Sequence, residues 1–350
     1  MDIATRVDLA VRGVRVDAPV RRHQGAGPSD DGHVVLDGEN AALPMNPDSP
    51  YQVRGGRVFS GRLDLGLTVE TVRRPKFYDL VTADGVPYEK IALLHGKDVL
   101  ATTVVQTCIR YVEEQRCKFC AIEESLRSGA TLAAKTPAQL AEVAEAAVRL
   151  DGIKQMVMTT GTTTGPDRGA RNLVRCVRAV LEAVPGLPIQ VQIEPPGDLS
   201  VIQDLHDAGA TAIGIHVESM DDELRLAWMP GKGSVPMAEY EAAWAEAVRV
   251  FGPNKVSTYL LIGLGEDPDE LVAGAARLIE MGVYPFVVPM RPMVGTLARR
   301  DGAVAASASV VSDVTERIGK LLQQAGMTGD GQEAGCAACG ACSALKVAGG

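Results

Sequence analysis

The cysteines are the residues of this chain whose type and spacing point to chemistry. Seven are present, and six form two groups of three: Cys108, Cys117 and Cys120, then Cys336, Cys339 and Cys342. Three thiolates that are close in sequence make a soft-ligand site for a zinc ion or an iron–sulfur cluster. Cys176 stands alone in a helical pattern, and we expect it to pack in the core.

The composition excludes several classes of protein. The chain has 350 residues, of which 46% are hydrophobic and 23% charged, a balance typical of globular proteins. A formal net charge of −9 does not suit a nucleic-acid partner. No apolar run is long enough to span a membrane, and residues 1–6 lack the basic start of a signal peptide. We therefore expect a soluble cytoplasmic protein with metal or redox chemistry, rather than a secreted disulfide scaffold.

Six short apolar runs alternate with helical patterns in the middle of the chain. The runs that predict strands are 99–107, 153–159, 187–194, 211–217, 255–262 and 284–290. The patterns that predict helices are 137–150, 170–183, 199–208, 237–251, 268–281 and 307–325. Strands that alternate with helices form parallel sheets with right-handed crossovers, either open and doubly wound or closed towards a barrel. The GxGxxG turn that would favour the doubly wound form is missing, and we predict an α/β fold with a partial (βα)6 TIM-like barrel.

The pattern divides the chain into three parts. Residues 1–98 predict a small β-rich extension, in which 1–57 are rich in Gly, Pro, Asp and Arg and read as loops and short strands. Residues 99–325 predict the barrel, and residues 326–350 form a cysteine-rich tail.

The carboxyl ends of parallel strands carry the chemistry of such folds, so the residues that follow each run are the candidates for a site. Cys108 follows the first run, and the loop continues to Cys117 and Cys120. From the residues alone this loop is either three ligands of a zinc ion, completed by His95 or His216, or the ligands of a [4Fe–4S] cluster with one open iron. The other ends carry polar or glycine-rich segments: Thr160-Gly161-Thr162, Glu194, Glu218, Gly263-Leu264-Gly265-Glu266, and Val288 with Arg291 beyond it.

With these motifs the chain resembles the radical SAM superfamily, and within it the biotin and lipoyl synthases. The resemblance covers about residues 99–325 and rests on the cysteine loop, with Phe119 before its last cysteine, and on the Gly-Leu-Gly-Glu segment that ends at Glu266. The usual spacing is CxxxCxxC, whereas the gap from Cys108 to Cys117 is longer. The resemblance implies that the three cysteines hold a [4Fe–4S] cluster whose fourth iron chelates S-adenosylmethionine.

The resemblance also implies roles for the other strand ends. Thr160, Gly161 and Thr162 would hold the amino group of the methionine moiety, and Glu218 would bind the ribose. Gly263 and Gly265 would let backbone approach the adenosine, and Val287 and Val288 would form an apolar wall under the adenine. Glu194 would anchor cofactor or substrate. In such enzymes one electron from the reduced cluster breaks the C5′–S bond, and the resulting 5′-deoxyadenosyl radical abstracts hydrogen from the substrate.

The tail predicts a second site. Its CxxCxxC pattern at 336–342 indicates an auxiliary iron–sulfur cluster, with a zinc knuckle or an uncoordinated tail as alternatives. Biotin synthase holds an additional cluster on cysteines of its barrel strands, and strands 187–194 and 255–262 contain none. Lipoyl synthase holds its additional cluster on an N-terminal cysteine motif, and residues 1–107 contain no cysteine. Neither route of sulfur insertion is therefore predicted. This combination resembles a radical SAM family encoded in bacterial nitrilase gene clusters linked to cyanide assimilation.

We therefore expect a radical SAM enzyme with a small-molecule substrate and a one-electron reductant such as ferredoxin or flavodoxin. We expect neither nucleic acid nor membrane as a partner. The alternatives are a non-catalytic iron–sulfur or zinc-binding barrel protein, and a zinc-dependent enzyme that uses His216.

Overall fold

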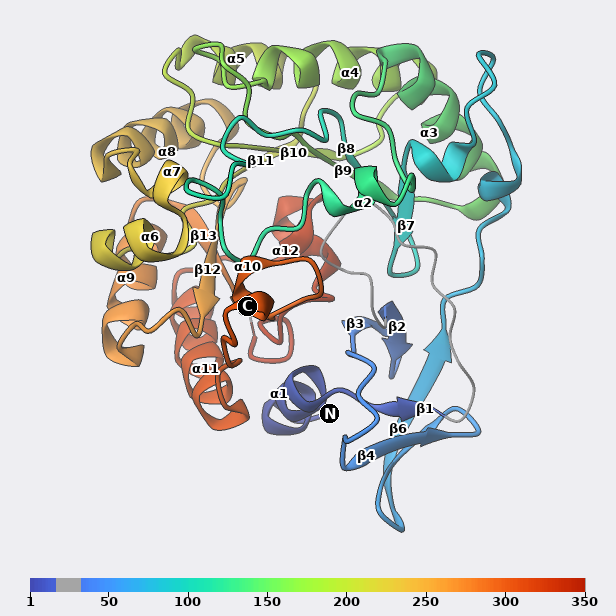
Figure 1. Ribbon diagram of the computed structural model, residues 1–350, viewed down its shortest axis with the longest axis vertical. Helices are drawn as coiled ribbons and strands as arrows, with labels where there is room; N and C mark the ends of the chain where they lie inside the picture. Colours follow the sequence, from blue (N-terminus) through green and yellow to red (C-terminus); the bar gives the residue numbers. More distant parts are fainter. Residues whose placement is uncertain (17–32, 350) are drawn as a thin grey trace.

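The protein consists of a curved, helix-covered sheet with a smaller sheet beside it (Figure 1). The structure, a computed structural model, describes residues 1–16 and 33–349. The loop prediction for residues 17–32 lies outside the described residues. Within them, no helix combines the length and the apolar character that crossing a bilayer requires.

The large sheet contains the six predicted strands in chain order. These are β8 (Val99–Thr103), β9 (Gln155–Thr159), β10 (Ile189–Ile193), β11 (Ala212–Ile215), β12 (Val256–Ile262) and β13 (Val283–Pro289). They pair in parallel, and β7 (Leu93–His95) adds an antiparallel edge beside β8. Because β7 and β13 are the two edges, the sheet curves without closing, which confirms the predicted α/β partial (βα)6 barrel.

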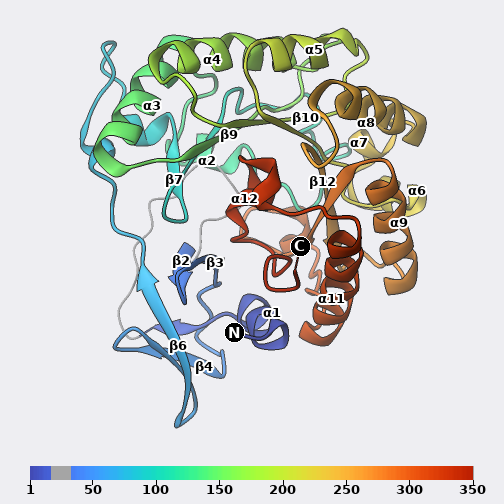
Figure 2. The same ribbon diagram turned by 180° about the vertical axis from the view of Figure 1, so that it is seen from behind.

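Six long helices cover the outer face of this sheet, as Figures 1 and 2 show. They are α3 (Pro137–Asp151), α4 (Ala170–Ala183), α5 (Ser200–Asp207), α8 (Met237–Phe251), α9 (Pro268–Glu280) and α11 (Ala308–Gln324). Each differs from its predicted range by no more than one residue at either end. The accuracy follows from strong boundary signals, such as the capping box that Thr136 and Gln139 form before Pro137.

Four short helices lie in the connections at the carboxyl ends of the strands. They are α2 (Glu124–Arg127), α6 (Asp222–Trp228), α7 (Pro230–Gly233) and α10 (Leu297–Arg300). None was predicted, because a helix of one or two turns carries too few residues for a periodic pattern. The predicted first strand, 99–107, is also shorter than expected, since the chain leaves the sheet after Thr103.

The N-terminal part forms a six-stranded sheet of its own. Its strands lie in the order β1 (Arg15–Val16), β4 (Tyr51–Arg54), β5 (Arg57–Ser60), β6 (Leu63–Thr71), β2 (His33–Leu36) and β3 (Glu39–Ala42). Two 3₁₀ turns, η1 (Lys76–Asp79) and η2 (Tyr88–Lys90), connect it to β7.

A helix, α1 (Ile3–Arg12), opens the chain, and the prediction of loops and short strands for this stretch was wrong. Asp2 caps the helix by accepting a hydrogen bond from the backbone N–H of Thr5. The buried face contains Arg6 together with Val7, Leu9 and Ala10, so a charge interrupts the apolar period that would have revealed the helix. It lies beside α11 (Figure 1).

The tail folds back into the concave side of the large sheet (Figure 2). It contains η3 (Asp330–Gln332) and α12 (Cys336–Cys339). The backbone N–H of Gly335 donates to Gln155 at the start of β9, at 2.7 Å. On its other side, the carbonyl of Ala341 accepts from the backbone N–H of Ala42 in β3, at 2.9 Å. The tail is therefore packed between the amino ends of the barrel strands and the N-terminal sheet.

Candidate functional site

The first cysteine loop begins where β8 ends and is closed by one buried amide. Gln106 donates from Nε2 to the carbonyl of Ile122, at 2.7 Å, and to the hydroxyl of Ser125, at 3.2 Å. Its carbonyl oxygen accepts from Lys135 at 3.0 Å. Gln106 thus joins the start of the loop to its end, so the long interval between Cys108 and Cys117 forms a closed structure.

The middle of the loop is fixed to three other strand ends. Ile109 donates its backbone N–H to Thr162 after β9, at 3.0 Å. Lys118 donates to the carbonyl of Trp228 at 2.7 Å and accepts from the N–H of Ala298 at 2.8 Å. These bonds hold Cys108, Cys117 and Cys120 over the carboxyl mouth of the barrel.

The three thiols lie near one another in a mostly enclosed space. Each is half-buried. Burial raises the pKa of Cys120 to about 11 and that of Cys117 well above its ordinary value. Cys108 raises both pKa values further, and Cys120 raises that of Cys117. Lys232 opposes the shift at both thiols, and Arg116 opposes it at Cys120. Thiols that mutually repel as anions and face cations suit a bound group that takes them as thiolates.

The described side chains offer no site for a single metal ion. Over residues 1–16 and 33–349, no three His, Cys, Asp or Glu side chains converge closely enough to hold one ion. An iron–sulfur cluster spreads its thiolates over separate iron atoms, so it does not require such convergence.

Glu218 forms a buried ion pair beside this loop. Lys232 donates from Nζ to its carboxylate at 2.5 Å, and Glu218 is 7% exposed. Burial raises the pKa of Glu218, and Lys232 opposes that shift. Glu218 also has a φ of 63°, a left-handed conformation that is strained for a residue with a side chain. Sequence reasoning missed Lys232, because it follows Pro230 in the unpredicted helix α7 and no strand end marks it.

Glu194 is the centre of a second buried network. Arg110, from the cysteine loop, donates to both carboxylate oxygens, at 2.5 and 3.0 Å. Arg168 donates at 3.1 Å and the hydroxyl of Thr162 at 2.7 Å. The chain itself therefore satisfies this carboxylate, and Arg110 links the cysteine loop to the end of β10.

The segment after β9 packs directly against the cysteine loop. A Cβ on Gly161 would lie 2.0 Å from the carbonyl oxygen of Thr107, so only glycine fits there. The N–H of Gly161 donates to the carbonyl of Val105 at 2.7 Å. Thr160 and Thr162 are thus held beside the loop that carries Cys108.

The loop after β12 is held by its own glutamate. The carboxylate of Glu266 accepts from the N–H groups of Gly263 and Leu264, both at 3.0 Å. Gly263 and Gly265 have φ values of 107° and 119°, which favour glycine. Val288 on β13 pairs with Leu261 of β12 and is buried, beside the same strand end.

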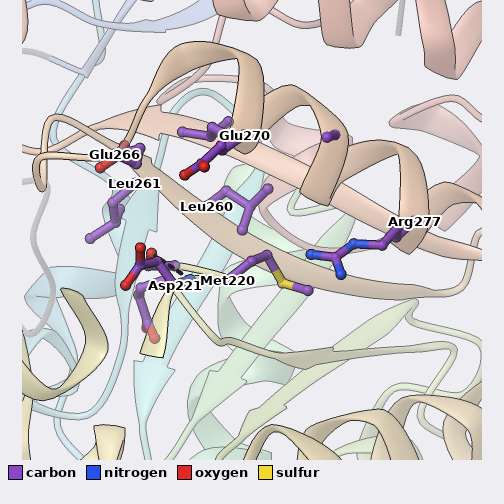
Figure 3. A pocket seen from close by; sticks show the side chains of 11 residues that line it. Met220, Asp221, Leu260, Leu261, Glu266, Glu270 and Arg277 are labelled. Atoms are coloured by element: carbon purple, nitrogen blue, oxygen red, sulfur yellow. Dashed lines mark hydrogen bonds between the residues drawn. The ribbon is translucent and has the colours of Figure 1, made fainter. Parts of the chain in front are cut away.

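A cavity of about 300 Å³ adjoins these strand ends on the side of α9 (Figure 3). Its lining includes Glu218 and Glu266 together with Leu260, Glu270 and Arg277. The cavity therefore lies behind the Glu218 and Glu266 loops, outside the concave side of the sheet that the tail occupies.

The tail cysteines form a second site inside the barrel, which the tail enters from the amino ends of the strands. Tyr259 of β12 hydrogen-bonds through its hydroxyl to Cys336, and Gln192 donates to the same sulfur at 3.4 Å. Asn40 of the N-terminal sheet donates to the sulfur of Cys339 at 3.8 Å. Burial raises the pKa of Cys336 to about 11 and of Cys339 to about 12. Hydrogen-bond donors aimed at enclosed sulfurs are typical of iron–sulfur ligands.

His216 lies between the two sites. Its ring stacks on Tyr259 with centroids 4.2 Å apart, and its Nδ1 accepts the N–H of Tyr259 at 3.2 Å. Nε2 is enclosed and has no hydrogen-bond partner. Burial, with Lys232 as a further cause, lowers its pKa to about 3. Cys176, in contrast, packs in the hydrophobic core on α4, as predicted.

Comparison with known proteins gives a match to one family model and to two curated relatives. Residues 114–278 match the model of the radical SAM superfamily, a range that includes Cys117 and Cys120 but begins after Cys108. A bacteriochlorophyllide c C-7(1)-hydroxylase of Chlorobaculum limnaeum is 24% identical over 234 residues, which are 61% of this chain and 57% of that protein. A lipoyl synthase of Thermus thermophilus is 28% identical over 173 residues, which are 48% of this chain and 50% of that protein. The chain thus spans about half the length of these relatives.

Solved structures resemble this chain at lower identity. Methylornithine synthase (PylB) is 18% identical with a TM-score of 0.46, over 65% of this chain and 68% of that one. The FeFe-hydrogenase maturase HydG of Carboxydothermus hydrogenoformans is 17% identical with a TM-score of 0.47, over 66% of this chain and 52% of that one.

Proposed function

We propose that the chain is a radical SAM enzyme that acts on a small molecule, because residues 114–278 match the model of the radical SAM superfamily. The observation that carries the proposal is the closed loop that holds Cys108, Cys117 and Cys120 over the carboxyl mouth of the barrel. When bound there, a [4Fe–4S] cluster supplies the electron that cleaves S-adenosylmethionine and so starts hydrogen abstraction from the substrate.

The surrounding cations fit such a group. Three thiolates bring negative charge into a partly buried space, which is costly without compensation. The positive charge of Lys232 favours the thiolate forms of Cys117 and Cys120, and that of Arg116 favours the thiolate of Cys120. Arg110 interacts electrostatically with Cys108. Glu194 contributes indirectly, because it fixes the position of Arg110.

The remaining strand ends would bind S-adenosylmethionine. Glu218, fixed by Lys232, is the group for the ribose hydroxyls, since a carboxylate accepts from both. The segment Thr160–Thr162 would receive the methionine end, and Phe119, within the cysteine loop, packs against the core. Gly263 and Gly265 would offer backbone, and Val288 an apolar side chain, to the adenosine. The order of the strands, which brings these strand ends to one mouth, supports these roles.

The tail cysteines Cys336, Cys339 and Cys342 would hold a second iron–sulfur cluster. The donors from Tyr259, Gln192 and Asn40 to the sulfurs support it. The substrate would lie between the two centres, where His216 has an unpartnered ring nitrogen. A one-electron reductant such as ferredoxin or flavodoxin would serve as the partner.

Anaerobic reconstitution tests the proposal. The loaded protein, reduced with dithionite in the presence of S-adenosylmethionine, should release 5′-deoxyadenosine and methionine. Cys117→Ala should lose this cleavage, while the control Cys176→Ala, which changes a core cysteine outside both groups, should keep it. A loaded wild type that releases no 5′-deoxyadenosine would favour the non-catalytic metal-binding alternative.

A further inference from the structure

One buried arginine of the N-terminal helix reaches the tail cysteines. Arg6 lies on α1 and is 3% exposed. Its Nη2 donates to the carbonyl of Ala341 at 2.8 Å, in the turn between Cys339 and Cys342. Its Nη1 is fully enclosed and has no hydrogen-bond partner. The side chain therefore spans from the N-terminal unit to the second cysteine site and ends there with an unused donor.

The charge of Arg6 has an unusual environment. The groups that act on it electrostatically are Arg291, a second cation, and the thiol of Cys342. Burial, with Arg291 as a further cause, lowers its pKa to about 10, and Cys342 opposes the shift. Arg291 itself donates to the carbonyl of Ala10 on α1 at 3.1 Å, and its charge acts on Cys342 as well. The charges of both arginines thus act on Cys342, and no carboxylate among the described residues acts on Arg6.

Such an arrangement needs an anion. A guanidinium stays protonated in proteins, and a buried charge without a counter-charge is strongly unfavourable. A neutral thiol cannot compensate the charge of Arg6, whereas a metal-bound thiolate can. The acidic group that acts on Arg6 is Cys342, which is already assigned as a cluster ligand from its spacing, so two independent observations indicate the same anion.

We propose that Arg6 and Arg291 are the counter-charges of an anionic iron–sulfur cluster held by Cys336, Cys339 and Cys342, so that helix α1 completes the second metal centre. This inference rests on the second cluster of the proposed function. Each electron that enters a cluster adds one negative charge, which nearby cations stabilise. The two arginines should therefore raise the reduction potential of this cluster, since net charge and hydrogen bonding to the sulfurs set such potentials.

The test uses the full chain with alanine in place of Cys108, Cys117 and Cys120, so that iron bound after reconstitution belongs to the tail. A redox titration followed by electron paramagnetic resonance gives the midpoint potential of that cluster. Arg6→Met, which keeps the apolar length and removes the charge, should shift the potential to a more negative value. Arg6→Lys should restore most of the shift. Arg12→Met changes an exposed arginine of the same helix, paired with Asp8, and should leave the potential unchanged.

The outcomes separate this inference from its premise. If the alanine background binds no iron, the second cluster is wrong, and the inference fails with it. If iron binds but Arg6→Met has the parent potential, the inference alone is wrong. A carboxylate probe, succinate, distinguishes a further case. If the potential is unchanged, and succinate protects the parent from thermal unfolding but does not protect Arg6→Met, the arginines bind an anionic ligand instead. Should Arg6→Met fail to fold, Arg291→Met in the same background must show the negative shift.

Discussion

The two cysteine groups reach one open barrel from opposite ends and are built in different ways. Cys108, Cys117 and Cys120 belong to the connection after β8, and neighbouring strand ends fix that connection in place. Cys336, Cys339 and Cys342 arrive from the far end of the chain and enter at the amino ends of the strands. The amino face of such barrels ordinarily serves stability. Here it carries sulfurs, hydrogen-bond donors and buried arginines.

The charges around the two groups differ as well. At the first group, two of the cations that act on the thiols are paired with a carboxylate: Arg110 with Glu194 and Lys232 with Glu218. At the second group, Arg6 has no carboxylate partner among the described residues. The first centre therefore has neutralised pairs in place before any group binds, whereas the second depends on its ligand for charge balance. This difference predicts that the tail becomes ordered with its metal.

The largest contrast should appear when one cysteine of each group is removed. Cys117→Ala should abolish release of 5′-deoxyadenosine, because the loop would lose a ligand of the cluster that supplies the electron. Cys339→Ala should retain that release in the absence of substrate, since the tail enters the barrel from the amino ends of the strands. Product analysis by liquid chromatography and iron determination on both variants check this expectation. Equal loss in both variants would mean that the two groups form a single functional unit.

Removing the charge pairs of the first site should have the next largest effect. Glu218→Gln keeps the shape and removes the charge that Lys232 faces. We expect S-adenosylmethionine to bind roughly 10- to 100-fold more weakly, because a hydrogen bond to a charged group contributes about 1.5–3 kcal/mol. Isothermal titration measures the affinity. The control is Glu223→Gln, an exposed change on α6, which should bind as the parent does.

Two glycines allow the stability of the two sites to be compared directly. A Cβ on Gly161 would lie 2.0 Å from a backbone oxygen at the first site, and a Cβ on Gly335 would lie 2.2 Å from Gln190 at the second. Alanine at either position should lower the free energy of unfolding by about 1–3 kcal/mol, through overpacking. Gly161→Ala should mainly reduce the iron of the first loop, and Gly335→Ala that of the tail.

Iron determination on the two glycine variants, together with denaturant unfolding, tests this separation. Gly38→Ala is the matched control for Gly335→Ala, because both glycines have a positive φ, 84° and 107°, but nothing lies within 4 Å of the Cβ added at Gly38. If Gly335→Ala retains its tail iron and its stability, the close packing of the tail on Gln190 is incorrect.

The sequence predicted the first site far better than the second. Its strands and helices have strong periods and caps, and chain order alone brings Cys108, Glu194, Glu218 and Gly263 to one mouth. Lys232 was missed because it lies in a one-turn helix. Arg6 and Asn40 were missed because their contacts to the tail cross about 300 residues, and no local pattern encodes such a contact. The link to nitrilase gene clusters, the bound cofactors and the individual site roles stay predictions.

The region between the two sites should give the smallest effect, through His216. Burial lowers its folded-state pKa from 6.5 to about 3, so it stays neutral at physiological pH. Below pH 6.5 the unfolded chain binds a proton that the folded protein excludes, and the free energy of unfolding must fall as pH decreases towards 3. At pH 5.5, one unit below the unfolded-state pKa, this loss is about 1.4 kcal/mol, since one pKa unit corresponds to about 1.4 kcal/mol. The free energy of unfolding from pH 7.5 to 5.5 should therefore be less pH-dependent in His216→Gln than in the parent, as denaturant unfolding measures it.

The control is the exposed His206, whose change to Gln should leave the slope of the unfolding free energy against pH as it is. An unaltered slope in His216→Gln would mean that the ring is accessible to protons, and that the space between the two cysteine sites is open to water rather than enclosed.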